Sequence, residues 1–147
     1  MLKSKVGYSI NPDPFIAGLE AAKESTKDFS NVKLNFLFTA ADDNVKKYLK
    51  GAQSATTSPI IGCTSSTGII VPDGYITSPS GFAGMLSLND SNMVVGIGCH
   101  EAGRDARAIG RKVAIEAVEN AKTTRAPAYF YMVSSPKEEE ELSLIHI

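Results

Sequence analysis

The chain has 147 residues, of which 43% are hydrophobic and 21% charged, proportions typical of a soluble globular domain. Its 15 basic and 16 acidic residues nearly cancel, and no basic run is interleaved with aromatic residues, which argues against a nucleic-acid surface. No apolar run approaches the ~20 residues that span a bilayer, and no signal-peptide core is present. We therefore expect a cytoplasmic protein with reduced cysteines and no nucleic-acid or membrane partner.

The first third of the chain predicts alternating strands and helices. Residues 5–9 form a candidate strand, and Asp13 followed by Pro14 is typical of a helix start. Gly18 inside this helix suggests a close approach to a sheet, because glycine is otherwise unfavourable there. The helix is expected to reach about Phe29, with its apolar face on Phe15, Leu19, Ala22, Thr26 and Phe29. A strand at 34–39 follows, and then a helix at 43–52 with Val45, Tyr48, Leu49 and Ala52 inward.

The stretch at 59–70 (PIIGCTSSTGII) predicts a buried strand, a polar turn and a second strand. Its four consecutive hydroxyl residues, Thr64 to Thr67, lie between two glycines. Such a loop can turn hydroxyls and backbone N–H groups toward a small polar or anionic ligand. In an ordinary turn, the same hydroxyls would instead satisfy their own backbone. The residues alone leave both interpretations open.

The rest of the chain repeats the beginning. Strands are predicted at 82–88 and 93–98, joined by a hairpin-like turn and preceded by a loop that carries Tyr75. A helix at 105–121, a strand at 128–134 and a capping box at 135–138 then complete a second repeat. The matching residues are Asp13, Gly18, Ala22 and Glu24 with Asp105, Gly110, Ala114 and Glu116. The helix at 105–121 is expected to bury Ala106, Ile109, Val113, Ala117 and Ala121. We predict an α/β fold of two β-α-β-α-β-like repeats, joined by antiparallel strands, as a mixed sheet with packed helices.

The second repeat stops before any counterpart of 59–68, and residues 142–147 (LSLIHI) resemble a translated sequencing adapter. We therefore expect residues 1–141 to be a truncated domain and 142–147 to be an artefactual tail, and His146 receives no functional role. A missing strand would leave a sheet edge or an apolar face bare, which predicts marginal stability.

Together these segments resemble the N-terminal half of a FIST sensory domain, over about residues 5–141. The resemblance rests on 6–9 (VGYS), 37–39 (LFT), 60–68 (IIGCTSSTG), the strand at 96–98 and the two helical glycines, Gly18 and Gly110. It implies a non-enzymatic, cytoplasmic input domain for signal transduction that binds a small ligand such as an amino acid. The implied partners are a C-terminal half and a signalling output domain. Relatives that carry F-box segments imply a protein-interaction module as the alternative. The chain departs from the family where Ile69 follows Gly68, since an acidic residue often stands there.

Candidate ligand-binding residues lie in the hydroxyl-rich loop and at neighbouring strand ends, where crevices form in sheet-based folds. They are Cys63, Thr64, Ser65, Ser66, Thr67, Gly68, Ser9, Asn11 and Thr39. Capping and turn chemistry is the alternative for each. Cys63 with His100, oriented by Glu101 or Asp105, would make a hydrolase or transferase, whereas a small buried thiol is the interpretation we prefer. No cofactor is expected and no metal, because Cys63, Cys99 and His100 lack metal-ligand spacing.

Overall fold

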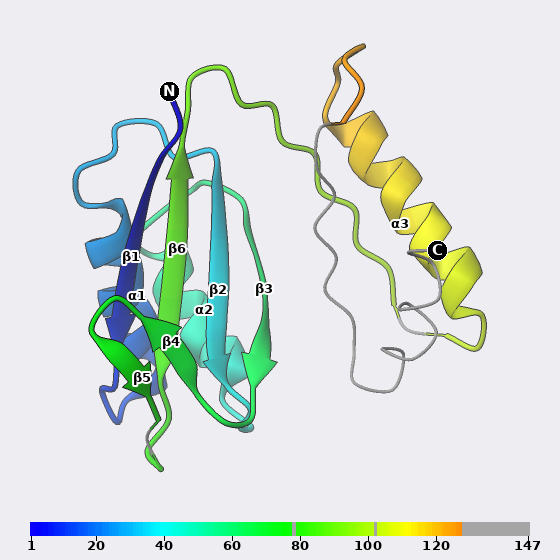
Figure 1. The fold of residues 1–147 in the computed structure, drawn as a ribbon. Coiled ribbons are helices and arrows are strands. Elements are labelled where there is room, and N and C mark those ends of the chain that lie inside the picture. The colour runs from blue at the N-terminus through cyan, green and yellow to red at the C-terminus, as the bar shows by residue number, and fades with distance from the viewer. Residues whose placement is uncertain (78, 102, 128–147) are drawn as a thin grey trace. The chain divides into compact units, whose positions relative to one another are not determined.

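The computed structural model describes residues 1–77, 79–101 and 103–127 and divides into two compact units, Met1–Met93 and Val94–Ile147 (Figure 1). The predicted strand at 128–134, the capping box at 135–138 and the tail at 142–147 lie outside the described residues. The first unit contains β1 (Lys3–Ser9), α1 (Pro14–Thr26), β2 (Leu34–Ala40), α2 (Val45–Gln53), β3 (Ile60–Ser65), β4 (Ile69–Val71), β5 (Gly74–Ile76) and β6 (Ala83–Asn89). The second contains α3 (Ala106–Asn120). No helix among the described residues is both long and apolar enough to cross a membrane.

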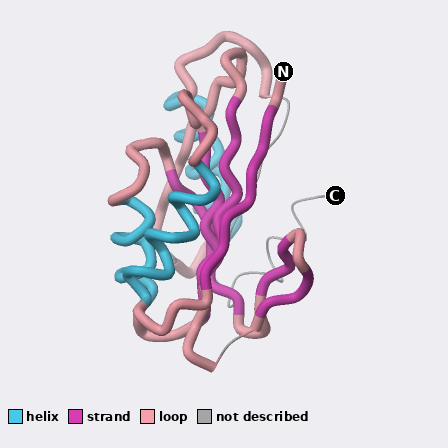
Figure 2. Tube along the Cα trace, turned by 90° about the vertical axis from the view of Figure 1, so that its left-hand side faces the viewer, coloured by secondary structure: helices cyan, strands magenta, loops and turns pink. Residues whose placement is uncertain are grey.

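A four-stranded mixed sheet in the order β1-β6-β2-β3 is the centre of the first unit. β6 pairs antiparallel with both β1 and β2, and β2 pairs parallel with β3. The helices α1 and α2 cover one face of this sheet, and the β4–β5 hairpin packs on the other (Figures 1 and 2). The predicted α/β class, with a mixed sheet and packed helices, is confirmed.

α1 begins where the sequence predicts, because Asp13 caps it. The Asp13 Oδ1 atom accepts hydrogen bonds from the backbone N–H groups of Phe15 and Ile16, at 2.8 and 3.2 Å. Of the predicted buried face, Ala22 is confirmed, whereas Phe15 is wrong because it is 38% exposed. The buried residues are the small ones, Ala17, Gly18, Ala21, Ala22 and Ser25. β1 passes so close that a Cβ on Gly7 would meet the carbonyl oxygen of Ala21, and larger side chains do not fit there.

Two glycines allow α1 and α2 to cross closely. A Cβ on Gly18 would overlap the carbonyl oxygen of Tyr48, and a Cβ on Gly51 would overlap that of Phe15. Gly18 therefore marks an approach between two helices, and the predicted approach to a sheet is wrong. Tyr48 and Ala52 are fully buried as predicted, whereas Val45 at the start of α2 is exposed.

The predicted loop around Tyr75 contains a strand, β5. Val71 pairs with Gly74 and Ile70 with Tyr75, so the turn between β4 and β5 consists of Pro72 and Asp73. Gly74 has a φ of +130°, a conformation that favours glycine and permits this tight reversal. The inward side chains of the hairpin, among them Ile69, Val71 and Ile76, pack with Phe82 and Phe38 on the sheet.

The segment at 93–98, predicted to be a strand, pairs with no strand among the described residues. The predicted hairpin between 82–88 and 93–98 is therefore wrong, since β6 pairs with β1 and β2 instead. The segment instead packs on α3, where a Cβ on Gly98 would meet the carbonyl oxygen of Val113. The side-chain amide of Asn120 also donates a hydrogen bond to the carbonyl oxygen of Ile97, at 2.8 Å. This arrangement repeats the packing of β1 on α1 through Gly7.

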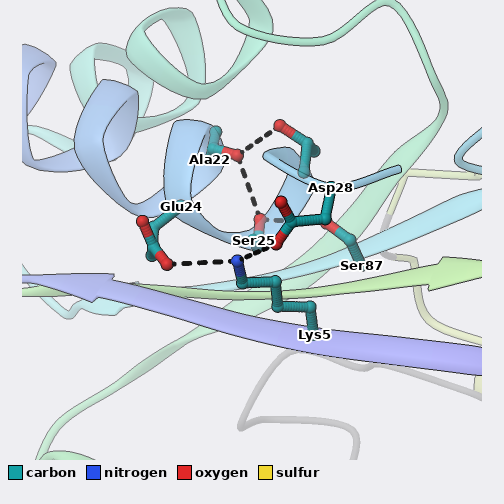
Figure 3. A network of polar contacts seen from close by, with 7 residues as sticks. Lys5, Ala22, Glu24, Ser25, Asp28 and Ser87 are labelled. Carbon is teal, nitrogen blue, oxygen red and sulfur yellow. Dashed lines mark hydrogen bonds and ion pairs between the residues drawn. The ribbon is translucent and has the colours of Figure 1, made fainter. Parts of the chain in front are cut away.

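A buried polar network joins α1 to the sheet (Figure 3). The hydroxyl oxygen of Ser87 in β6 lies 2.9 Å from that of Ser25 in α1 and 2.7 Å from Oδ1 of Asn35 in β2. Asn35 Nδ2 donates in turn to the carbonyl oxygen of Pro59, at 3.1 Å. The network thereby connects α1, β6, β2 and the residue before β3.

Near this network, Lys5 of β1 forms ion pairs with two carboxylates of the α1 region (Figure 3). Its Nζ lies 2.7 Å from Asp28 Oδ2 and 3.2 Å from Glu24 Oε1. The hydrogen bond from Lys5 lowers the pKa of Asp28 and the same contact raises the pKa of Lys5. Both carboxylates are exposed, so solvent screens these pairs and they add little to stability.

Candidate functional site

The register of the sheet aligns residues from four strands in one row. Ser9 of β1 and Thr39 of β2 both pair with Ala83 of β6, and Thr39 also pairs with Thr64 of β3. We call these residues, Ser9, Ala83, Thr39 and Thr64, the strand-end row. With neighbouring strands about 4.8 Å apart, the row is about 14 Å long. Ala83 belongs to the core beneath the helices, so the row lies on the helix-covered face, near the carboxyl ends of β1, β2 and β3.

Two of the three hydroxyls in the row bind neighbouring groups. Ser9 Oγ donates a hydrogen bond to Glu20 Oε2 of α1 at 2.6 Å and accepts one from the backbone N–H of Asn11 at 3.1 Å. Thr39 is buried, and its hydroxyl lies 3.3 Å from the carbonyl oxygen of Ala40. Thr64 and Glu20 are exposed. Thr64 and Glu20 are therefore the groups through which this row meets solvent.

Asn11 follows the row and shapes the loop into α1. Its Oδ1 accepts a hydrogen bond from the backbone N–H of Asp13 at 3.0 Å, which is the turn chemistry proposed as its alternative role. α1 and α2 start shortly after β1 and β2, so both helix N-termini lie at this edge of the sheet. Asn44 at the start of α2 makes no side-chain capping bond, whereas Asp13 caps α1. A helix N-terminus attracts anions, and at α2 the Asp42 carboxylate already accepts a hydrogen bond from the backbone N–H of Asn44, at 2.7 Å.

The hydroxyl-rich loop divides between the two faces of the sheet. Side chains alternate along a strand, so Cys63 faces away from Thr64 and lies next to Phe38 in register, on the hairpin side. The predicted burial of β3 and of its thiol is wrong, because Cys63 is exposed. Among the described residues, β3 is an edge strand of the four-stranded sheet and pairs only with β2. Its other edge has no neighbouring strand in this part of the chain, which is consistent with the exposure of Cys63.

Ser65 and Gly68 close the turn that follows β3. Ser65 Oγ donates to the carbonyl oxygen of Gly68 at 2.6 Å and accepts from its backbone N–H at 3.4 Å. The Tyr75 hydroxyl donates to the carbonyl oxygen of Thr67. Ser66 and Thr67 are exposed in this turn. Ser65 therefore has a structural role, and the turn belongs to the hairpin rather than to the strand-end row.

Sequence reasoning missed three groups at the carboxyl ends of β1 and β2: Glu20, Asp42 and the Tyr48 hydroxyl. Tyr48 donates a hydrogen bond to Asp42 Oδ2 at 3.1 Å, and a Cβ on Gly81 would meet the same hydroxyl. The position of Asp42 directly after a strand is a signal that could have found it. Glu20 offers no such signal, because a charged residue on a helix is usually just solvated.

The Tyr48 hydroxyl gives this region a pH dependence. Burial, and to a lesser extent the hydrogen bond to Asp42, raise the pKa of Tyr48 to about 12, whereas an unfolded tyrosine ionises at about 10. The stability that Tyr48 contributes is therefore complete below pH ~10 and is lost as the pH rises toward ~12, by about 3 kcal/mol in total. We expect Tyr48→Phe to lose less unfolding free energy than the natural chain between pH 9 and pH 11, measured by urea unfolding. Tyr75→Phe, at an exposed tyrosine, is the control, and equal losses in all three chains would contradict this assignment.

The two residues proposed for a nucleophilic site belong to different units, Cys63 to the first and His100 to the second. His100 Nδ1 lies 3.1 Å from the carbonyl oxygen of Glu101. Asp105 Oδ1 accepts from the backbone N–H of Ala108 at 2.8 Å, so this carboxylate caps α3. The described residues contain no group of at least three His, Cys, Asp or Glu side chains that could hold a metal ion.

An open hollow of about 530 Å³ lies at the carboxyl ends of α1 and α2. Its lining comes from residues within 26–32 and 53–58, most of them polar, and includes none of the predicted ligand-binding residues. Its hydroxyls bind nearby backbone carbonyls, as Ser54 does to Gly51 at 2.6 Å and Ser58 to Val32 at 2.9 Å. These contacts explain the polarity of the hollow without a ligand.

Comparisons with known proteins give no family. No family model matches the sequence, and no curated protein matches it. Among solved structures, thiamine monophosphate kinase from Aquifex aeolicus matches with a TM-score of 0.36 and 13% sequence identity, over 99% of this chain and 49% of that chain. The chain thus spans about half the length of that kinase. A likeness this weak carries no argument about function.

Proposed function

We propose that the chain is a non-enzymatic, cytoplasmic sensory input domain that binds a small ligand, an amino acid, at the strand-end row. The observation that supports this most is the sheet register, which aligns Ser9, Thr39 and Thr64. In open α/β sheets, ligands bind beyond the carboxyl ends of the strands. The output would pass to a signalling partner of the domain.

The groups around the row suit the two charged ends of an amino acid. The Glu20 carboxylate, fixed by the Ser9 hydroxyl at 2.6 Å, would attract the ammonium group. Backbone N–H groups in the first turn of α2, beyond Asn44 whose N–H binds Asp42, would donate hydrogen bonds to the ligand carboxylate. The exposed hydroxyl of Thr64 lies at the opposite end of the row from Ser9, so it would hydrogen-bond the far end of a long amino-acid side chain. Ile69 follows Gly68 in this chain, at a position where FIST domains often carry an acidic residue. Glu20 would thereby supply the negative charge that this acidic residue provides in the family.

The test is thermal unfolding of the full chain against a panel of amino acids and small carboxylates. A ligand present at ~100 times its dissociation constant adds about 2.7 kcal/mol to stability, which moves the midpoint by several degrees. Thr64→Val should weaken ligand affinity about tenfold, because it removes the exposed hydroxyl of the row. The shift of the unfolding midpoint at the same ligand concentration should therefore be smaller. Thr77→Val, at an exposed threonine after β5, should keep it. A panel without any shift, or a shift that survives Thr64→Val, would count against this site.

A protein-interaction module is the second candidate. Ile70 and Tyr75 are exposed cross-strand neighbours on the outer side of the β4–β5 hairpin. Exposed apolar pairs of this kind are more typical of contact surfaces than of small-molecule pockets. A cooperative melt that no compound shifts would favour this function over the sensory one.

A further inference from the structure

α3 has a second apolar side besides the one that packs on Gly96 and Gly98. Ile115 and Val118 are 48% and 43% exposed. They line an open hollow of about 430 Å³ together with the residues Arg111, Ala114 and Glu119. We call these five residues, Arg111, Ala114, Ile115, Val118 and Glu119, the α3 stripe.

The internal repeat shows how this side of α3 differs from the matching side of α1. Ala114 matches Ala22 of α1, which is fully buried. α2 crosses α1 at Gly18, and α3 carries Gly110 at the matching position. Ile115 and Glu119, however, match Lys23 and Lys27, which are exposed, so the α3 stripe is apolar at Ile115 where the matching position of α1 is charged.

The charges of the α3 stripe are complementary to themselves. Arg111 and Glu119 are separated by eight positions in the sequence, about 12 Å along a helix. The apolar part of the stripe lies between them. If two copies of α3 pack antiparallel about a two-fold axis, Arg111 of each copy faces Glu119 of the other, Ile115 meets its own copy at the axis, and Val118 lies about 4.5 Å to either side of it. An acidic peptide would leave Glu119 opposed by like charge, and a basic peptide would do the same to Arg111.

We propose that a second copy of this chain binds the α3 stripe in this antiparallel arrangement. Arg107 and Lys122 lie beyond the two ends of the stripe, and their like charges would repel in a longer contact. The interface is therefore confined to the central turns of α3. An interface this small predicts a weak dimer that depends on protein concentration. The proposal does not depend on the ligand site in the first unit.

Sedimentation of the full chain over a concentration series tests the proposal, with a monomer–dimer equilibrium as the expected result. Arg111→Glu and Glu119→Arg should each weaken dimerisation at least about tenfold, because each places like charges opposite one another. The double variant Arg111→Glu with Glu119→Arg restores both pairs and should dimerise like the natural chain. Lys112→Glu changes an exposed charge of α3 outside the stripe and should have no effect.

Rescue by the double variant cannot come from misfolding, and circular dichroism of each variant provides a separate check of the helix. Ile115→Asp should abolish the dimer by placing two carboxylates in its apolar centre. A chain that stays monomeric at every concentration overturns the proposal. A dimer that survives Ile115→Asp, or a double variant that fails to regain dimerisation, overturns it as well.

Discussion

Gly18→Ala is expected to lower the free energy of unfolding by roughly 3 kcal/mol, although alanine stabilises an exposed helix by about 1 kcal/mol relative to glycine. The reversal follows from the helix crossing, where a Cβ on Gly18 would overlap the carbonyl oxygen of Tyr48. This obstacle is a backbone atom, so no rotamer change relieves the clash. α2 would have to move away from α1 and would lose the packing of Tyr48 and Ala52, which are fully buried.

Urea unfolding followed by circular dichroism measures this effect. Lys47→Ala, at an exposed position of α2, should change stability by no more than about 0.5 kcal/mol. Gly51→Ala should cost about as much as Gly18→Ala, because its Cβ would meet the carbonyl oxygen of Phe15. The double variant should cost less than the sum, since helices already separated by one Cβ make room for the other. A Gly18→Ala chain as stable as the natural one would show that the helices do not cross this closely.

The starts of α1 and α3 could be predicted because their causes are local. Asp13 and Asp105 each bind a backbone N–H within three residues of themselves. The order of strands in the sheet could not be predicted in this way. β6 lies between β1 and β2, yet it follows them by more than forty residues. Gly18 shows the same limit, since a helical glycine signals a close neighbour without identifying it.

The candidate site was predictable to a similar depth. The sequence placed Ser9 and Thr39 at strand ends, which is where the structure has them, whereas Thr64 was expected in the polar turn and lies in β3. Their alignment depends on the register of β6 with β1 and β2. This register is set by pairing between strands that are far apart in the sequence, so local sequence patterns do not reveal it. Thr64 and Cys63 are adjacent in sequence, but the pleat sends them to opposite faces. Their separate roles emerge only once the face covered by the helices is known.

Asn35→Ala is expected to lower the free energy of unfolding by about 3 kcal/mol, the largest effect we expect from a polar side chain. Asn35 is fully buried in β2, and its amide binds both the Ser87 hydroxyl and the Pro59 carbonyl oxygen. Alanine would leave a cavity and remove the acceptor of a buried hydroxyl. Asn31→Ala, at an exposed asparagine before β2, should change stability by less than about 0.5 kcal/mol.

Ser87→Ala separates the cost of the cavity from that of the hydrogen bond. Ser87 loses one hydroxyl and little volume, so its replacement should cost only about 1 kcal/mol. If the network couples Asn35 to Ser87, the double variant should be more stable than additivity predicts, because Asn35→Ala no longer leaves the Ser87 hydroxyl without its acceptor. Strict additivity would mean that the two side chains stabilise the fold independently. The connection of α1 to β2 through Ser25, Ser87 and Asn35 would then be a set of separate contacts, and α1 would owe its position on the sheet mainly to its small buried residues.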